Sequence, residues 1–430
     1  MNRRLTTAVS LVLAFAASPA SALDLDTALR QVATANPTLS ARRAQVAAER
    51  HGAPAAGAWD APMLEVGLVN VPVTGRLDTD PMTMRMVGLE QRVPISGARS
   101  LARRAREQAA AAESSGAAAT ALELYADTWG SYADAYWGEW LAHAARAHLA
   151  EMDGMVKTAR ARYESGHGRL EALLDAEAER TIAGSDASRF AAEARGARAA
   201  LDALRGVPPG GAADTLAPPP EPAVPADASG WIAALDATHP RLAAPAADAR
   251  RYRYQAASAR RETWPDLDLR FSYGFRATLA DGTPQNDMFS AIVGLSLPLF
   301  ASGHDAATGH ELDALARARE DEATGARLEL TRGLTGAHAD AQAAAWAARS
   351  LADTVLVLRT QAVDAAWSAY GAGIADLDQV LTRSHARWSD EIELTRTRQR
   401  LAHALARALT LVGRGEPFGV TLPPFEEETP

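Results

Sequence analysis

The stretch Tyr163-Glu-Ser-Gly166-His-Gly-Arg-Leu170-Glu-Ala-Leu-Leu174 recurs 207 residues later as Tyr370-Gly-Ala-Gly373-Ile-Ala-Asp-Leu377-Asp-Gln-Val-Leu381. One tyrosine, one glycine and two leucines keep the same spacing in both copies. In each copy the glycine interrupts a very long helical pattern, and a second helical pattern follows it. Because glycine readily adopts the backbone angles of a tight turn, each stretch predicts the tip of a helical hairpin.

Four further landmarks recur in the same order, with offsets between 203 and 207 residues: Asn36-Pro37 with His239-Pro240, Trp59 with Trp264, Val87-Gly88-Leu89 with Val293-Gly294-Leu295, and Leu204-Arg205-Gly206 with Leu411-Val412-Gly413. Such an ordered set indicates a tandem duplication of one structural unit. The first repeat is predicted at 23–206 and the second at 229–413. A proline-rich linker at 207–228 joins them, and a tail follows at 414–430.

The composition excludes several classes of protein. The formal net charge of the 430 residues is −9, which gives no support to general nucleic-acid binding. The chain contains no cysteine, which excludes disulfides, thiolate metal sites, a cysteine nucleophile and a lipidated N-terminal cysteine. Aromatic residues make up only 6%, and long stretches mix Ala, Leu, Arg and Glu, which is typical of extended helices.

The first 22 residues have the pattern of a secretory signal peptide. Arg3 and Arg4 precede a short apolar core at 9–17, and Ala20-Ser21-Ala22 is a small-x-small cleavage site. No later segment offers the ~18 unbroken apolar residues that a membrane helix needs. A membrane-spanning form of this chain would therefore have to be a β-barrel.

Four stretches of about ten residues alternate between apolar and polar side chains, as outer-membrane barrel strands do. They lie at about 63–71, 82–93, 266–276 and 288–299. The phase slips near Met86-Val87, which predicts a bulge or the point where the strand leaves the bilayer. Trp59 and Trp264 precede the two strand pairs and suit the aromatic girdle at a membrane interface. An ordinary half-buried soluble hairpin remains an alternative interpretation of the same pattern.

Two long segments are free of helix breakers over about 99–162 and 304–369, and shorter returning helices follow each tip. The predicted helical hairpins span about 99–205 and 304–412. Helices of this length need partners along their whole length, which antiparallel coiled-coil packing provides. The predicted fold is therefore mainly α with a membrane β-barrel, built from a duplicated unit of a long antiparallel hairpin plus two transmembrane strands. Since four strands cannot close a barrel and an open edge is excluded from lipid, two, three or four chains must pool their strands into one tube.

We find no catalytic motif, so the sequence predicts neither an enzyme nor a bound cofactor or resident metal ion. Met82, Met84 and Met86 alternate along one predicted strand and could act as soft ligands for Cu(I). A packed or lipid-facing apolar strand face explains the same methionines and is the favoured interpretation.

Acidic residues follow the tip glycines, with Asp175 in the first copy and Asp376 and Asp378 in the second. In a symmetric oligomer each would form a ring that favours cations at a constriction. Ordinary stabilisation of a helix N-terminus by carboxylates explains them equally well.

The whole mature chain resembles the TolC-type outer-membrane efflux family in its duplicated unit, its Tyr-x-x-Gly tips and its Val-Gly-Leu strand exits at Val87 and Val293. The resemblance implies a passive homotrimeric duct with a twelve-stranded barrel in outer-membrane lipid and a helical tunnel reaching into the periplasm of a bacterial cell. It also implies that the tips dock onto a periplasmic adaptor linked to an inner-membrane pump, of the resistance-nodulation-division type. The implied docking residues are Tyr163, Gly166, Leu170, Leu174, Tyr370, Gly373, Leu377 and Leu381.

Two finer features bear on this resemblance. The run from Leu89 to Gly97 and the arginines at 99, 103 and 104 look like the heavy-metal branch, which implies export of heavy-metal cations; small toxic compounds are the other substrate class. Prototype channels carry aspartates six and nine residues after the second tip glycine, where this chain has Gln379 and Thr382. The candidate periplasmic gate is therefore Asp175, Asp376, Asp378, Gln379 and Thr382.

The competing interpretation is a periplasmic coiled-coil adaptor or scaffold without a membrane barrel. Such a protein would carry one helical hairpin between small β-domains, whereas this chain predicts two hairpins and four barrel-length strands. An exported enzyme is disfavoured because no active-site motif is present.

Overall fold

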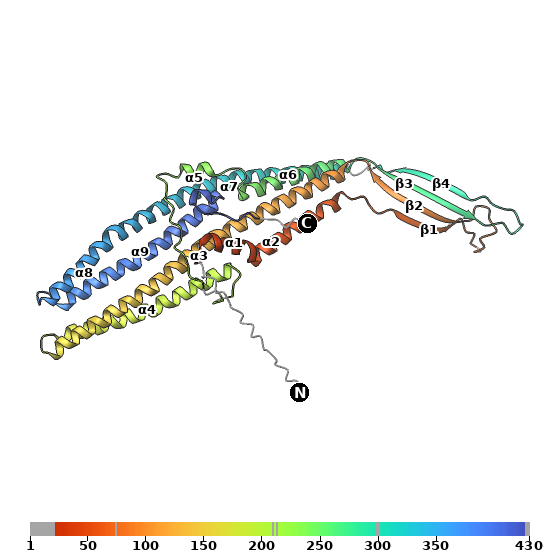
Figure 1. Ribbon diagram of the computed structural model, residues 1–430. Helices are drawn as coiled ribbons and strands as arrows, with labels where there is room; N and C mark the ends of the chain where they lie inside the picture. The colour runs from red at the N-terminus through yellow and green to blue at the C-terminus, as the bar shows by residue number, and fades with distance from the viewer. Residues whose placement is uncertain (1–21, 74, 209, 212–213, 298–301, 426–430) are drawn as a thin grey trace, which may run out of the picture.

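The computed structural model describes residues 22–425 except 74, 209, 212–213 and 298–301. The predicted signal peptide up to residue 21, the end of the strand predicted at 288–299 and the last five residues of the tail lie outside this range. The described chain is elongated, with a four-stranded sheet at one end and the tips of two helical hairpins at the other (Figure 1). Of the predicted fold, mainly α with a membrane β-barrel, the mainly helical chain with a small antiparallel sheet is confirmed, and the four strands of one chain do not close a barrel.

Two hairpins of long helices form the body of the molecule. In the first, α3 (Ala98–Glu164) has 67 residues and turns back into α4 (Leu170–Leu204). In the second, α7 (Ser302–Ser350) passes through a π-helical turn η1 (Leu351–Val355) into α8 (Leu356–Gly371), and α9 (Leu377–Val412) returns. The sequence predicted no interruption in this helix, because a π-turn needs neither proline nor glycine.

Shorter helices enter each hairpin. They are α1 (Leu25–Ala35) and α2 (Pro37–Gly57) in the first repeat, and α5 (Ser229–Ala234) and α6 (Pro240–Arg261) in the second; a short 3-10 helix, η2 (Glu416–Phe418), follows α9. Asn36 accepts a hydrogen bond from the Thr38 N–H at 2.9 Å and caps α2, while its amide donates to the carbonyl of Leu204 at 2.9 Å. His239 caps α6 in the same way, and its Nε2 lies 3.1 Å from the carbonyl of Thr410. Each cap residue thus ties the entry helix of its repeat to the end of the returning helix.

The largest core cluster joins α1, α3, α7 and α9 around Trp129, Tyr132 and Phe418, all almost fully buried. Tyr125 and Trp137 of α3 are buried in the same cluster. The Tyr132 hydroxyl lies 2.7 Å from the carbonyl of Leu23 and 2.6 Å from that of Ala217, and it can donate to one of them at a time. Burial raises the pKa of this hydroxyl, which remains neutral as a donor.

The sheet contains β1 (Met63–Val69), β2 (Met84–Pro94), β3 (Asp266–Arg276) and β4 (Met288–Leu295), antiparallel and in sequence order. The register puts Leu64, Leu89, Phe271 and Ala291 in one row across the four strands, and Val66, Val87, Tyr273 and Phe289 in the next. Residues paired across strands share a face. One face is consequently exposed and mainly apolar, with Arg85 and Gln91 as its polar members, while the opposite face carries Glu65, Gly88, Ser272 and Ser290.

The structure corrects two expectations for β2. The pairing of β2 continues without a break on both sides, so the bulge predicted near Met86-Val87 is wrong. The strand begins at Met84, and Met82 lies in the preceding turn. Met86 pairs with Gly67 and Gly274, on the face opposite Val87, so Met84 and Met86 lie on the polar face and not on the apolar one.

Among the described helices, none combines the length and apolarity needed to cross a membrane.

Candidate functional site: the hairpin tips and the seam between the repeats

The two tips have the same turn. Gly166 and Gly373 both adopt left-handed backbone angles, with φ of 76° and 73°. Each glycine N–H donates to the carbonyl of the tyrosine three residues earlier, at 3.0 and 3.2 Å. The next N–H, of His167 or Ile374, donates back across the turn to Arg162 or Ala369 at 2.9 Å. This is the Schellman arrangement that ends a helix, and it explains why glycine recurs at both positions.

The two tips differ in what they expose. In the first tip Tyr163, Leu170 and Leu174 are 43%, 49% and 55% exposed. Their counterparts Tyr370, Leu377 and Leu381 are buried, in a cluster that also contains Met155, Val156 and Leu173 of the first hairpin. The structure thus brings only the first set to the surface. The sequence did not single out Ile374, which is 84% exposed at the second tip.

Arg162 joins the two tips. Its guanidinium donates to the carbonyl of Tyr370 at 3.0 Å and lies 4.0 Å from the centre of the Tyr370 ring. A cation over an aromatic face is attracted by the ring quadrupole. The contact holds Tyr370 against the first hairpin. No local sequence pattern predicts it, because the partners are 208 residues apart.

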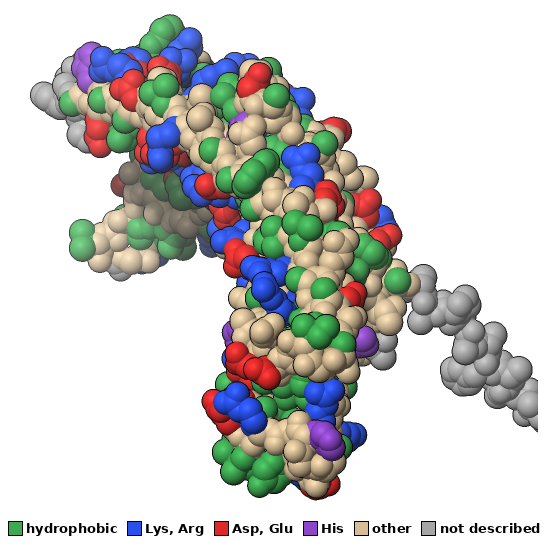
Figure 2. Space-filling model, turned by 90° about the vertical axis from the view of Figure 1, so that its left-hand side faces the viewer, with side chains coloured by type: hydrophobic (Ala, Val, Ile, Leu, Met, Phe, Trp, Pro, Cys, Tyr) green, Lys and Arg blue, Asp and Glu red, His purple; other side chains and the backbone are tan. Residues whose placement is uncertain are grey.

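The candidate gate residues are exposed beside the tips. Asp376 precedes α9 as its N-cap residue, but its side chain makes no capping hydrogen bond. Asp378, Gln379 and Thr382 face outward from the first turns of α9, and Asp175 faces outward from α4. Viewed from this end of the molecule, hydrophobic side chains lie among charged ones on the surface (Figure 2). At the far end of the helices, Trp59 and Trp264 are exposed where α2 and α6 lead into the sheet (Figure 1).

A polar network joins the hairpins further from the tips. Glu151 of α3 accepts hydrogen bonds from Ser384 and Arg387 of α9, both at 2.6 Å. Burial would raise the pKa of Glu151, but His148, Ser384 and Arg387 together outweigh burial and lower the pKa to about 2. Next to it Trp388 stacks on the His148 ring, at 4.9 Å between centroids, and donates to Asp186 of α4 at 3.1 Å. The second hairpin is thereby bonded to both helices of the first.

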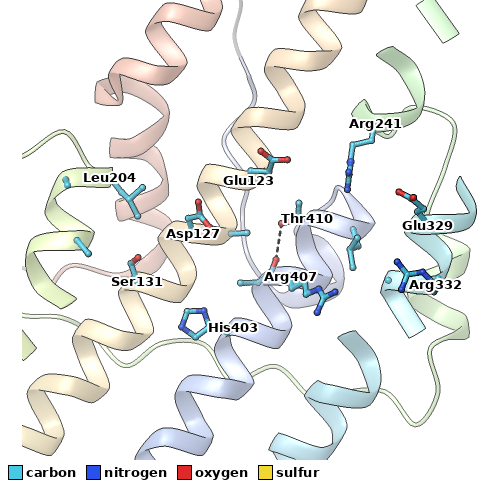
Figure 3. Close-up of a pocket in the computed structure, with 16 residues that line it drawn as sticks. Glu123, Asp127, Ser131, Leu204, Arg241, Glu329, Arg332, His403, Arg407 and Thr410 are labelled. Atoms are coloured by element: carbon cyan, nitrogen blue, oxygen red, sulfur yellow. Dashed lines mark hydrogen bonds between the residues drawn. The ribbon is translucent and has the colours of Figure 1, made fainter. Parts of the chain in front are cut away.

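A groove follows the seam between the repeats, with a volume of about 890 Å³. In Figure 3 the carboxylates of Glu123 and Asp127 on α3 lie on one side of the groove, and Arg241 and Arg332 lie on the other. Asp127 and Ser131 are each two positions beyond the buried Tyr125 and Trp129, which is about 200° around the helix. The groove therefore lies on the side of this helical layer opposite the core that contains α1.

His403 of α9 bridges the seam. Its Nε2 lies 2.9 Å from a carboxylate oxygen of Asp134 on α3. A Cβ at Gly130 would come within 2.6 Å of the imidazole, so glycine makes room for the ring. The hydrogen bond that protonated His403 donates to Asp134, together with the charges of Asp134 and Asp127, raises the pKa of His403 against the opposing effect of burial.

This bridge predicts a pH dependence. Because the folded pKa of His403 lies above its unfolded value, the stabilisation is fully present below pH 6.5 and is lost as the pH rises through the folded pKa. The pair is half exposed, so its contribution stays within about 1 kcal/mol. We expect Asp134→Asn to lower the thermal midpoint at pH 5.5 and to leave it unchanged at pH 9. Equal differences at both pH values would show that the bridge does not titrate.

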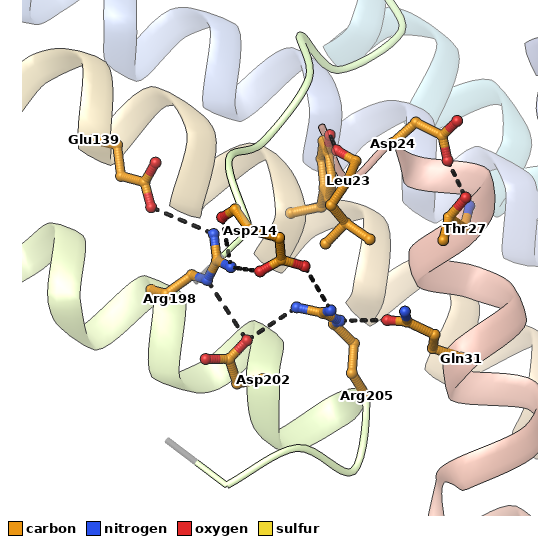
Figure 4. A network of polar contacts seen from close by, with 10 residues as sticks. Leu23, Asp24, Thr27, Gln31, Glu139, Arg198, Asp202, Arg205 and Asp214 are labelled. Atoms are coloured by element: carbon orange, nitrogen blue, oxygen red, sulfur yellow. Dashed lines mark hydrogen bonds and ion pairs between the residues drawn. The ribbon is translucent and has the colours of Figure 1, made fainter. Parts of the chain in front are cut away.

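A buried ion network ties the linker to the helical body (Figure 4). Asp202 is fully buried at the end of α4, where it lies 3.1 Å from Arg205 and 3.5 Å from Arg198. Asp214 of the linker pairs with both arginines, and Arg205 also donates to Gln31 of α1 at 2.6 Å. The sequence predicted a proline-rich linker here. It did not predict the ion pairs that hold the linker to α4.

The comparisons with known proteins agree with this geometry. Residues 231–414 match the model of the family "Outer membrane efflux protein". No curated protein matches the chain in sequence. Three similar solved structures are the outer-membrane channel OprN (TM-score 0.72, 17% identity, 90% of this chain and 89% of that chain), the outer membrane protein VceC of Vibrio cholerae (0.71, 18%, 90% and 96%) and the open state of the MtrE outer membrane channel of Neisseria gonorrhoeae (0.72, 17%, 91% and 89%).

At these identities the structural likeness concerns the fold, which is shared over about nine-tenths of the chain. The sequence match covers the second repeat. The chain is therefore similar to the outer membrane efflux proteins in the sequence of its second repeat, and to solved outer-membrane channels in its fold throughout.

Proposed function

We propose that the protein is the outer-membrane channel of a tripartite efflux system, a passive homotrimeric exit duct and not an enzyme. The observation that carries this proposal is the sheet, whose exposed face is mainly apolar across all four strands. Within the described residues β1 and β4 each pair with only one other strand, so each leaves an open edge. In lipid such edges must be paired, and three chains would close a twelve-stranded barrel.

The helical hairpins would continue this barrel into the periplasm. We assign Trp59 and Trp264 to the membrane interface, and we divide the chain into repeats at 23–206 and 229–413, as the sequence suggested. The carboxylates of Asp175, Asp376 and Asp378, with Gln379 and Thr382, would line the periplasmic entrance as rings. Such rings favour cations, which supports heavy-metal cations as exported substrates; small toxic compounds are the other class.

We further propose that the first tip docks the periplasmic adaptor, which links the duct to an inner-membrane pump of the resistance-nodulation-division type. Tyr163, Leu170 and Leu174 are exposed there, and Ile374 of the second tip is exposed too. The buried residues Tyr370, Leu377 and Leu381 would support docking indirectly, because they hold the two hairpins together.

Single cysteines test the docking surface, because the chain has no cysteine of its own. Leu174 and Leu381 hold the same position in the two tips, but Leu174 is 55% exposed and Leu381 only 6%. We expect Leu174→Cys, labelled with a maleimide–benzophenone reagent in cells, to crosslink to the adaptor on irradiation. Leu381→Cys is the matched control and should give no such product. Adaptor crosslinks from neither cysteine, in a strain whose efflux is intact, would remove the docking assignment.

A further inference from the structure

Four of the eight methionines lie on the polar face of the sheet, and three of them gather around one residue of β3. Met86 of β2 lies directly opposite Gly274 of β3, and Met288 of β4 lies opposite the same glycine on its other side. Met84 is two residues from Met86 on the same strand and therefore points to the same face. The register thus places three thioether side chains around one residue that has no side chain.

The structure shows one of these sulfurs in place over the glycine. A Cβ built on Gly274 would overlap the Sδ of Met84. Gly274 is buried, although Phe275 beside it in β3 is 49% exposed. Met84 therefore covers Gly274, and Met86 and Met288 flank the position that its sulfur occupies.

Most of the side chains that surround Met86 and Met288 on this face are polar or small. Three further members are apolar, namely Met63, Ile292 and Val69, which lies opposite Met84; the others named here are charged, hydroxyl-bearing or small: Glu65, Gly67, Gly88, Glu90, Arg270, Ser272 and Ser290. Arg270 is paired with Glu90 at 2.5 Å. Arg276, opposite Met84, donates to the carbonyls of Asn286 and Pro81 at 2.6 and 2.9 Å. The nearby arginines are thus engaged with oxygen atoms, and the thioether sulfurs are the soft donor atoms at this end of the face.

Thioether sulfur is a soft ligand that selects soft monovalent metal ions over hard cations. We propose that Met84, Met86 and Met288 form a binding site for a soft monovalent cation of the Cu(I) or Ag(I) class, centred over Gly274. Because Gly274 has no side chain, the Met84 sulfur can lie over it, between the strand positions of Met86 and Met288. Met82 is not part of this site, since it lies in the turn before β2.

The site lies near the end of the sheet furthest from the helices, next to the loops at 70–83 and 277–287 (Figure 1). In the proposed duct this is the exit end, and the polar face would line the passage. The role of the site in export rests on the proposed function, and it would make soft metal ions a substrate class. Metal binding by the purified protein does not depend on that role.

Silver ion is the probe for the test, added as silver nitrate to the purified full-length protein in chloride-free detergent buffer. Binding is measured by equilibrium dialysis and metal analysis. We expect one Ag⁺ per chain for the wild type and for the control Met82→Leu. The combined Met84→Leu, Met86→Leu and Met288→Leu variant keeps the apolar volume but loses the sulfurs, and we expect roughly tenfold or greater weakening.

Equal Ag⁺ affinity of the triple variant and Met82→Leu would overturn the proposal, as would the absence of binding by the wild type. Met288→Leu alone provides a milder variant at an edge strand, where only one strand pairs with β4, and it should weaken binding by a smaller factor. Export of an organic toxicant by the same variants separates the two proposals. A triple variant that exports the toxicant normally but binds no Ag⁺ supports the metal site, whereas a wild type that binds Ag⁺ and exports nothing contradicts only the duct.

Discussion

Phe271→Arg is expected to stop the chain from assembling in the outer membrane. Phe271 is the central residue of β3 and is 47% exposed on the apolar face, between Leu89 and Ala291. An arginine on the lipid face of a barrel costs about 2–4 kcal/mol near the bilayer midplane. In a homotrimer each assembled barrel would carry that cost once per chain. The variant should therefore lose nearly all trimer from the outer-membrane fraction, as measured on unboiled gels.

Ser290→Arg is the matched control. Ser290 lies on β4 and points to the polar face, in the row of Glu65 and Ser272. The same charge placed there should leave trimer levels close to the wild type. Equal losses for both variants would show that charge matters on either face, and normal levels for Phe271→Arg would remove the membrane assignment of the sheet.

Asp202→Ala is expected to destabilise the helical body by about 3–5 kcal/mol, because it removes the fully buried carboxylate that Arg198 and Arg205 share. Asp202 is fully buried and Arg205 is 3% exposed, so water cannot replace the lost carboxylate. The linker should loosen at the same time, since Asp214 is held by the same arginines. Denaturant unfolding measures the first effect, and limited proteolysis within 207–228 measures the second.

Glu139→Gln tests the specificity of this result. Glu139 also pairs with Arg198, at 3.6 Å, but its side chain is 45% exposed. Exposed ion pairs contribute about 1 kcal/mol or less, so Glu139→Gln should change stability little. A similarly small effect of Asp202→Ala would mean that the network does not hold the linker to the body.

Much of the fold could be predicted because short-range sequence patterns determine it. The αL glycines Gly166 and Gly373 mark both tips, and the alternation in β3 marks both faces of the sheet. Prolines at the first position of α2 and α6 mark the entry helices. Each of these signals depends on residues within about one turn or one strand of each other, which a sequence displays directly.

What could not be predicted depends on packing between the repeats. Leu174 and Leu381 occupy equal positions in equal motifs, yet only Leu381 is buried, since the first hairpin covers the second tip. The bridges Arg162–Tyr370 and His403–Asp134 join residues more than 200 positions apart. Met86 was misplaced for a related reason. Its neighbour Val87 is also apolar, and only the cross-strand register shows which of the two faces Gly274.

The central claim is that three copies of this chain form one outer-membrane tube. The most direct test is to fractionate cells that express the protein, extract the outer membrane in mild detergent and determine the native mass of the protein. The account predicts an outer-membrane species with the mass of three mature chains, which separates into monomers on boiling. A monomer in the soluble periplasmic fraction would contradict it and would favour the periplasmic scaffold.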